Sequence, residues 1–200
     1  MRSVPERQIR QVCVYCASSQ KVDHAYLNAA AQLGELLAGA HITLVYGGGG
    51  SGLMGAVADG ALRSGGKVIG VLPRFMEAIE WGHTGLTELR LVDDMHERKR
   101  VMIESADAVV ALPGGSGTLE ELLEVITLKR LGIFLHPIVL ANLRGFYDPL
   151  IRQFDEAIRQ GFMDERHREM WSVVTDVSGV LTAIRDSPEW GADARSFARV

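Results

Sequence analysis

The chain has 200 residues, of which 47% are hydrophobic and 23% are charged, and its formal net charge is −4. These values are typical of one globular domain with a sizeable core, and the acidic balance argues against nucleic acid or an anionic membrane as a partner. No apolar run is as long as a membrane span, and residues 1–8 are too polar for a signal peptide, so we expect a single cytoplasmic domain over residues 1–200.

Apolar runs typical of buried strands alternate with segments of helical spacing along most of the chain. Strands are expected at residues 9–17, 42–46, 67–72, 86–92, 108–112, 137–141 and 173–174. Helices are expected at residues 23–38, 53–64, 94–105, 119–131, 147–160, 166–171 and 177–185. Residues 74–85 are expected to be irregular, and residues 186–200 to form a loose tail. The alternation predicts an α/β fold, a Rossmann-like doubly wound parallel sheet in three α-β-α layers.

Cys13 and Cys16 have C-x-x-C spacing, but they lie inside the first predicted strand. Three residues apart on a strand, they would point to opposite faces, so we expect two buried cysteines and no redox or zinc site. The six histidines are scattered singly along the chain, and no metal is expected.

Two glycine-rich turns follow two of the predicted strands. Residues 47–52 satisfy G-x-G-x-x-G, but the next strand ends at Pro73 without the acid that a dinucleotide site requires. Residues 114–117 form the second turn, within the segment 113–121 that reads PGGSGTLEE. Both turns would open at the same edge of a parallel sheet. One could hold a phosphate while the other lets a sugar or base approach, which suits a mononucleotide.

Charged residues near the second turn each have two interpretations. Thr118 and Glu121 fit a capping box, with Thr118 as the N-cap, but Glu121 also fits a catalytic carboxylate. Glu120 projects about 100° away on a helix, so only one of the two glutamates is expected to point into the site. Arg98 and Lys99 fit a solvated basic helix start, although their position opposes the helix dipole and favours a functional role.

The segments MHERK at 95–99 and PGGSGTLEE at 113–121 resemble the MHxRK and PGGxGTxxE motifs of the LOG (Lonely Guy) family, long labelled as lysine decarboxylases. The resemblance extends over about residues 12–184. It implies a homodimeric Rossmann-like hydrolase, without a cofactor, that splits the N-glycosidic bond of N6-modified adenosine 5′-monophosphates. The products would be the free purine base (a cytokinin) and ribose 5-phosphate.

The resemblance also assigns roles to residues of this chain. The catalytic pair falls on Arg98 and Glu121. The substrate-binding positions fall on Ser19, Gly48, Glu80, Lys99, Gly114, Gly115, Ser116, Gly117, Thr118, Glu120 and Thr127. Lys129 and Arg130 depart from the usual family sequence and are expected to bear on the base pocket or the dimer surface.

Charge considerations predict the state of Glu121. A helix N-terminus and Arg98 would both favour its ionised form, which suits a base or a stabiliser of positive charge better than an acid. The alternative function is a nucleotide or cofactor carrier of the same fold without turnover. A carrier would need the glycine turns but not Arg98 and Glu121 together.

Overall fold

The computed structural model describes residues 8–77 and 82–198 of the chain. These residues form one seven-stranded sheet in the order β4-β3-β2-β1-β5-β6-β7, and every neighbouring pair is parallel. The strands are β1 (Gln11–Tyr15), β2 (Thr43–Tyr46), β3 (Val68–Pro73), β4 (Glu88–Val92), β5 (Ala108–Ala111), β6 (Ile138–Ala141) and β7 (Ser172–Val174). The α-helices are α1 (His24–Gly39), α2 (Gly52–Arg63), α3 (Met95–Glu104), α4 (Ser116–Arg130), α5 (Asp148–Arg159) and α6 (Val180–Arg185).

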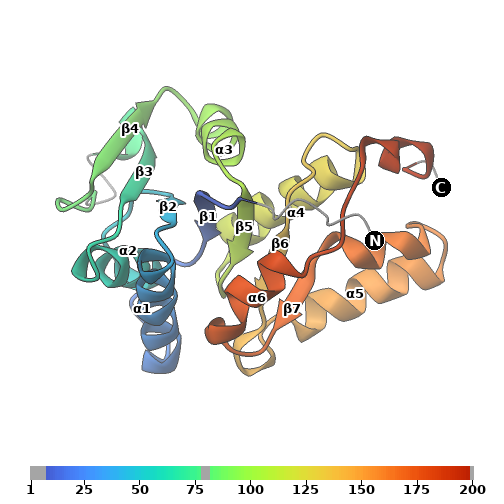
Figure 1. Cartoon of the computed structure of the whole chain (residues 1–200), viewed down its shortest axis with the longest axis horizontal. Helices are drawn as coiled ribbons and strands as arrows, with labels where there is room; N and C mark the ends of the chain where they lie inside the picture. Colours follow the sequence, from blue (N-terminus) through green and yellow to red (C-terminus); the bar gives the residue numbers. More distant parts are fainter. Residues whose placement is uncertain (1–7, 78–81, 199–200) are drawn as a thin grey trace.

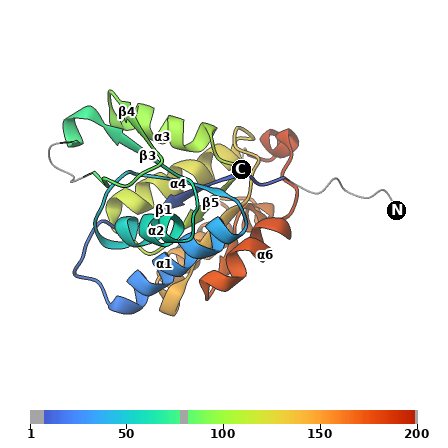
Figure 2. The ribbon, with the colours of Figure 1, turned by 60° about the vertical axis from the view of Figure 1, so that its left-hand side comes forward.

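The sheet lies between two layers of helices (Figure 1). One apolar cluster joins α1, α2 and α6 to one face, and a second joins α3, α4 and α5 to the other. Figure 2 shows α3 and α4 on the opposite side of β1 and β5 from α1, α2 and α6. Because strand residues alternate between faces, Cys13 packs in the second cluster and Cys16 in the first, both buried and unbridged, as predicted. The α/β, three-layer, doubly wound fold is confirmed.

The strand order positions the site. From β1 the chain moves outward through β2, β3 and β4, and it then returns to place β5 on the other side of β1. The crevice beyond the carboxyl ends of β1 and β5 is therefore the switch point at which open α/β sheets bind ligands. The two segments that follow these strands touch, because the Ala17 amide donates to the Pro113 carbonyl at 3.3 Å.

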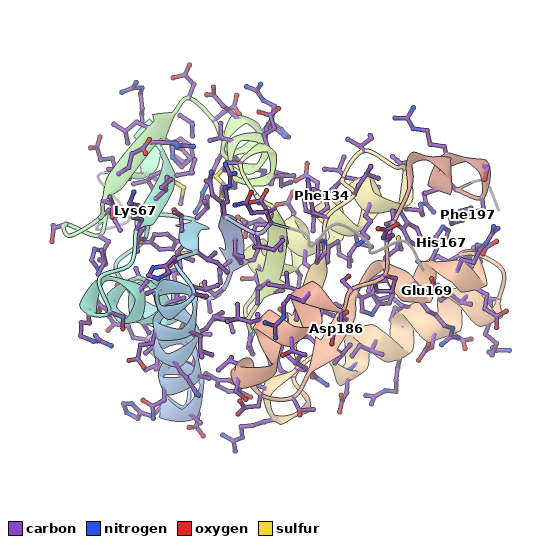
Figure 3. All side chains as sticks on the ribbon, in the orientation of Figure 1. Lys67, Phe134, His167, Glu169, Asp186 and Phe197 are labelled. Carbon is purple, nitrogen blue, oxygen red and sulfur yellow. The ribbon has the colours of Figure 1, made fainter. Side chains whose placement is uncertain are left out.

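The C-terminal segment differs from the expected loose tail. Trp190 is buried, and its indole N–H donates to the Lys129 carbonyl at 2.7 Å. Ala194 is buried as well, and the Phe197 ring lies 5.7 Å from the His167 ring (Figure 3). The prediction was wrong for residues 186–198 because two aromatic rings anchor a stretch that has few other apolar side chains.

Lys129 also lies elsewhere than expected. Its side chain is fully buried under this C-terminal segment, 5.9 Å from the centre of the Trp190 ring, and its ammonium donates to the His136 carbonyl at 2.8 Å. The expectation that Lys129 bears on the base pocket or the dimer surface was therefore wrong. No helix among the described residues has the length and apolar character that crossing a membrane demands.

Candidate active site

A cavity of about 380 Å³ opens at the switch point between β1 and β5. Its walls come from the segment after β1, the first turns of α4 and the start of α3. Met54 and Met76 complete them. The lining residues are Cys16, Ala17, Ser18, Ser19, Met54, Met76, Met95, Arg98, Gly115, Ser116, Gly117, Thr118, Glu120 and Glu121. The predicted catalytic pair, Arg98 and Glu121, thus meets in one cavity although 22 positions separate the two residues in the sequence.

The start of α4 lines the cavity. The helix begins at Ser116, with Gly115 as N-cap and no side-chain capping bond. Because the first turn of a helix leaves its N–H groups without intrahelical acceptors, Ser116, Gly117 and Thr118 offer donors and the positive end of the helix dipole to a ligand. These three residues and Gly115 all line the cavity.

The capping-box interpretation was wrong. The helix starts two residues before Thr118, so Thr118 lies inside the first turn and is not the N-cap. The Glu121 carboxylate makes no capping bond, and no hydrogen bond or ion pair to it occurs among the described residues. Glu121 is therefore available for chemistry in the cavity.

Gly114 is required by its contact with Thr118. A Cβ atom at Gly114 would lie 2.0 Å from Thr118 Oγ1 and 2.5 Å from its Cβ, whereas a Cβ atom at Gly115 would meet nothing within 4 Å. We expect Gly114→Ala to lower the free energy of unfolding by about 1–3 kcal/mol, as overpacking does. The matched control Gly115→Ala should change it by less than about 0.5 kcal/mol. Thermal unfolding measures both, and equal melting temperatures would contradict the contact.

Glu121 is 7% exposed, and burial raises the pKa of its carboxyl to about 7, although the nearby Arg98 charge acts in the opposite direction. The prediction that the ionised form is favoured was wrong, because desolvation outweighs the attraction of Arg98. At neutral pH this carboxyl both accepts and releases a proton readily, which is the property of a general base that must be regenerated in each turnover.

Arg98 is 4% exposed, so the interpretation as a solvated basic residue was wrong for it. Its Nε donates to the Val71 carbonyl at 3.1 Å, and its Nη2 donates to the Gly47 carbonyl at 2.9 Å. These two carbonyls, from β3 and from the turn after β2, fix the guanidinium in the wall of the cavity. No carboxylate of the described residues lies within 4.0 Å of it, so its positive charge can act on a bound anion or on Glu121.

The first glycine turn packs against Arg98. A Cβ atom at Gly47 would lie 2.1 Å from Arg98 Nη2, so a glycine there gives the guanidinium its place. Residues 47–52 are not among those that line the cavity. The expectation that this turn lets a sugar or base approach stays a prediction, and packing against Arg98 explains the glycine at position 47.

Lys99 and the two adjacent glutamates form a cluster beside the cavity. The Lys99 ammonium is buried, and it pairs with Glu120 and, at 3.0 Å, with Glu124. Although burial lowers the pKa of Lys99, its hydrogen bonds to Glu120 and Glu124 raise it above its ordinary value. Both Glu120 and Glu121 line the cavity, whereas only one was expected to, because the cavity wraps around the first turns of α4.

The remaining predicted substrate-binding residues are placed differently from one another. Ser19 lines the cavity, whereas Gly48, Lys99 and Gly114 are not among its lining residues. Thr127 lies three turns along α4 on its exposed side, where its hydroxyl donates to the Leu123 carbonyl. Glu80 lies outside the described residues.

Sequence reasoning missed several residues of the cavity wall. These are Cys16, Ala17, Ser18, Met54, Met76 and Met95. The first three directly follow β1, so the switch-point rule could have identified them once the strand order was known. Met95 opens the motif at 95–99, which could have identified it, whereas Met54 and Met76 carry no local signal that separates them from ordinary core residues.

Comparison with known proteins identifies relatives of this chain. Residues 54–184 match a family model described as possible lysine decarboxylase. A protein of Oryza sativa subsp. japonica named probable cytokinin riboside 5′-monophosphate phosphoribohydrolase is 42% identical over 183 residues, which cover 92% of this chain and 81% of that protein. A cytokinin riboside 5′-monophosphate phosphoribohydrolase of Rhodococcoides fascians is 43% identical over 177 residues, covering 88% and 89%.

Among solved structures, the molybdenum cofactor carrier protein of Chlamydomonas reinhardtii matches with a TM-score of 0.68 at 23% identity, covering 88% of this chain and 96% of that one. A likeness at this identity concerns the fold alone and does not favour the carrier alternative. By the family model and by relatives of more than 40% identity over most of its length, the chain belongs to the LOG family of phosphoribohydrolases.

Proposed function

We propose that this protein hydrolyses the N-glycosidic bond of purine nucleoside 5′-monophosphates, with N6-modified adenosine 5′-monophosphates as the preferred class. The products are the free base and ribose 5-phosphate. The observation that carries this proposal is the buried Glu121, which makes no hydrogen bond or ion pair with the described residues and lines one cavity with Arg98 and the first residues of α4. A carrier would have no need of an unpaired buried carboxyl, which is costly to keep ionised.

The substrate phosphate binds at the start of α4. The N–H groups of Ser116, Gly117 and Thr118 and the helix dipole hold its oxygens, and Arg98 adds a positive charge in the same cavity. This binding takes place away from the bond that breaks. It orients the ribose, so its energy contributes to the rate and not only to affinity.

The reaction takes place at C1′ of the ribose. As the C1′–N9 bond breaks, its electron pair leaves with the purine and positive charge builds on the sugar. The Glu121 carboxylate stabilises that charge and takes a proton from the attacking water, whose oxygen bonds to C1′. The purine takes its proton from solvent, and Glu121 then releases the proton that it received.

The base pocket is apolar and adaptable. Met54, Met76 and Met95 line the same cavity as Glu121, and methionine side chains fit ligands of varied shape. This wall supports the preference for an adenine that carries an apolar N6 substituent.

The test is base release from a panel of AMP, N6-isopentenyl-AMP and adenosine, followed by chromatography of the free base. We expect kcat/KM for adenosine to be at least about 10²-fold lower than for AMP, because the nucleoside lacks the group that α4 binds. Comparable turnover of adenosine and AMP would contradict the phosphate site. Binding of AMP without any release of base would instead support the carrier alternative.

We further propose that the chain acts as a homodimer in the cytoplasm. Leu123, Leu131 and Ile133 are large apolar side chains that lie exposed on α4 and the residues after it, which supports an interface there. Light scattering on the full chain distinguishes a dimer from the 21.8 kDa monomer.

A further inference from the structure

The segment that leads from β5 to α4 is held by hydrogen bonds from three sides. Its first two residues are Leu112 and Pro113. The Leu112 amide donates to the Tyr15 carbonyl at 2.9 Å, and the Ala17 amide donates to the Pro113 carbonyl at 3.3 Å. The third bond comes from the Tyr147 hydroxyl, which donates to the Leu112 carbonyl at 2.7 Å. The first two bonds join main-chain atoms, so only the third depends on which side chain is present.

Tyr147 is a rigid donor that lies outside the cavity. It is 1% exposed, and burial raises the pKa of its hydroxyl, so the hydroxyl keeps its proton and stays a donor. Its amide donates to Asn142 Oδ1 at 2.7 Å, and its carbonyl accepts from the Ile151 amide of α5 at 2.9 Å. Asn142 in turn donates from its amide to the Val174 carbonyl at 2.7 Å and from Nδ2 to Asp148 Oδ1 at 2.7 Å. Contacts with α5 and with the ends of β6 and β7 therefore fix the phenol.

The Leu112 carbonyl controls where the chain leaves the sheet. It is buried, and it lies one residue beyond the last residue of β5. Because Pro113 has no N–H group, the strand ladder cannot continue, and the tyrosine hydroxyl supplies the donor that this carbonyl needs. The close approach of Gly114 to Thr118 packs the following turn directly against the first turn of α4. A shift of the Leu112 carbonyl would therefore move the N–H groups at the start of α4.

We propose that Tyr147 is a positioning residue for phosphate recognition. Its hydroxyl fixes the Leu112 carbonyl and thereby orients the N–H groups at the start of α4 toward the 5′-phosphate of the substrate. Asn142 contributes to the same role, because it holds the main chain of Tyr147. This inference rests on the proposed function, in which the start of α4 binds the phosphate. It adds a residue from outside the cavity to those that determine the preference for nucleotides over nucleosides.

The experiment measures kcat/KM for AMP and for adenosine in the wild-type chain and in Tyr147→Phe, which removes one hydroxyl and keeps the ring. A displaced helix start weakens the contribution of the phosphate, which adenosine lacks. We therefore expect the ratio of the two kcat/KM values to fall about 10-fold. Both substrates are measured on the same preparation, so a loss of folded protein does not alter the ratio.

Tyr46→Phe is the matched control. The Tyr46 hydroxyl is also buried, and it donates to the Gly49 carbonyl at 3.1 Å in the turn after β2. Tyr46→Phe should lower the melting temperature about as much as Tyr147→Phe, because each variant loses a buried hydrogen bond. It should change the ratio by less than about 2-fold, since its turn is not the one proposed to hold the phosphate.

A double variant tests the contribution of Asn142. Asn142→Ala removes the acceptor of the Tyr147 amide and should lower the ratio in the same direction as Tyr147→Phe. Asn142→Ala combined with Tyr147→Phe should lower the ratio no further than Tyr147→Phe alone, because both residues act through the Leu112 carbonyl. Additive losses would contradict the role of Asn142.

An unchanged ratio in Tyr147→Phe would overturn the proposal, whatever the melting temperature, and so would an equal fall of the ratio in Tyr46→Phe. Calorimetric binding of ribose 5-phosphate provides a readout without turnover. Its Kd should rise about 10-fold in Tyr147→Phe and stay unchanged in Tyr46→Phe. If the wild-type chain releases no base from AMP, the proposed function fails, yet this difference in Kd would still support the role of Tyr147.

Discussion

Replacing Glu121 with glutamine should abolish turnover and make the protein more stable. We expect kcat for AMP to fall about 10³-fold, because glutamine can neither accept the proton of the attacking water nor offset positive charge on the ribose. The fold should not suffer, since Glu121 caps no helix and makes no hydrogen bond or ion pair with the described residues. Base release and thermal unfolding, measured on the same preparation, give both results.

The stability gain depends on pH in a defined direction. Burial raises the pKa of Glu121 from 4.5 to about 7, so between these values the native state binds more protons than the unfolded state. Stability therefore falls as pH rises through this window, and above pH 7 the full penalty of the buried charge is present. We expect Glu121→Gln to raise the free energy of unfolding by about 1–3 kcal/mol at pH 8 and to leave it nearly unchanged at pH 4.

The pH dependence of the wild-type activity should reflect the ionisation of Glu121. Since the ionised carboxylate is the active form, kcat/KM should rise with pH to a plateau above about pH 7. Ionisation of the substrate phosphate should add a smaller rise in kcat/KM near about pH 6.

Glu35→Gln is the matched control for Glu121→Gln, because Glu35 lies exposed on α1 on the other face of the sheet. It should alter neither activity nor stability. A fully active Glu121→Gln would remove the basis of the mechanism.

Two replacements of Arg98 should separate its charge from its geometry. Arg98→Lys keeps the charge but cannot donate to the Val71 and Gly47 carbonyls as the guanidinium fork does. We expect kcat/KM to fall about 10²-fold or more and the free energy of unfolding to fall by about 1–3 kcal/mol, the cost of a buried carbonyl left unpaired. The pH at which kcat/KM rises to half of its plateau should stay near about 7 in Arg98→Lys, because the positive charge beside Glu121 is kept.

Arg98→Met removes the charge as well. The Arg98 charge lowers the pKa of Glu121. Loss of this charge should therefore move the midpoint of the rise in kcat/KM above pH 7. Arg100→Met is the matched control, since the Arg100 side chain is 62% exposed on the same helix, and its pH profile should equal that of the wild type. If Arg98→Met and Arg98→Lys gave the same pH profile, the electrostatic coupling of Arg98 to Glu121 would be disproved.

The sequence alone determined the order of strands and helices, because each strand of a parallel sheet is buried on both faces and appears as a continuous apolar run such as residues 108–112. It also identified the family, because the two motifs at 95–99 and 113–121 are specific to it. Local sequence patterns gave wrong predictions for segments whose structure depends on contacts with residues distant in the chain. The C-terminal segment looked polar, and only the packing of Trp190 against α4 showed that it is fixed.

Tertiary structure alone decided the state of each charged residue. The sequence placed Glu121 at a helix start and predicted an ionised carboxylate, but the pKa depends on burial by residues distant in the chain, which raises it to about 7. The sequence likewise assigned the turn at 47–52 to a ligand, and only the folded chain shows that the Arg98 guanidinium packs against Gly47 in this turn. The physical reason is the same in both cases. Motifs record which groups are present, but desolvation and close packing arise only when β1, β3, α3 and α4 meet at one edge of the sheet.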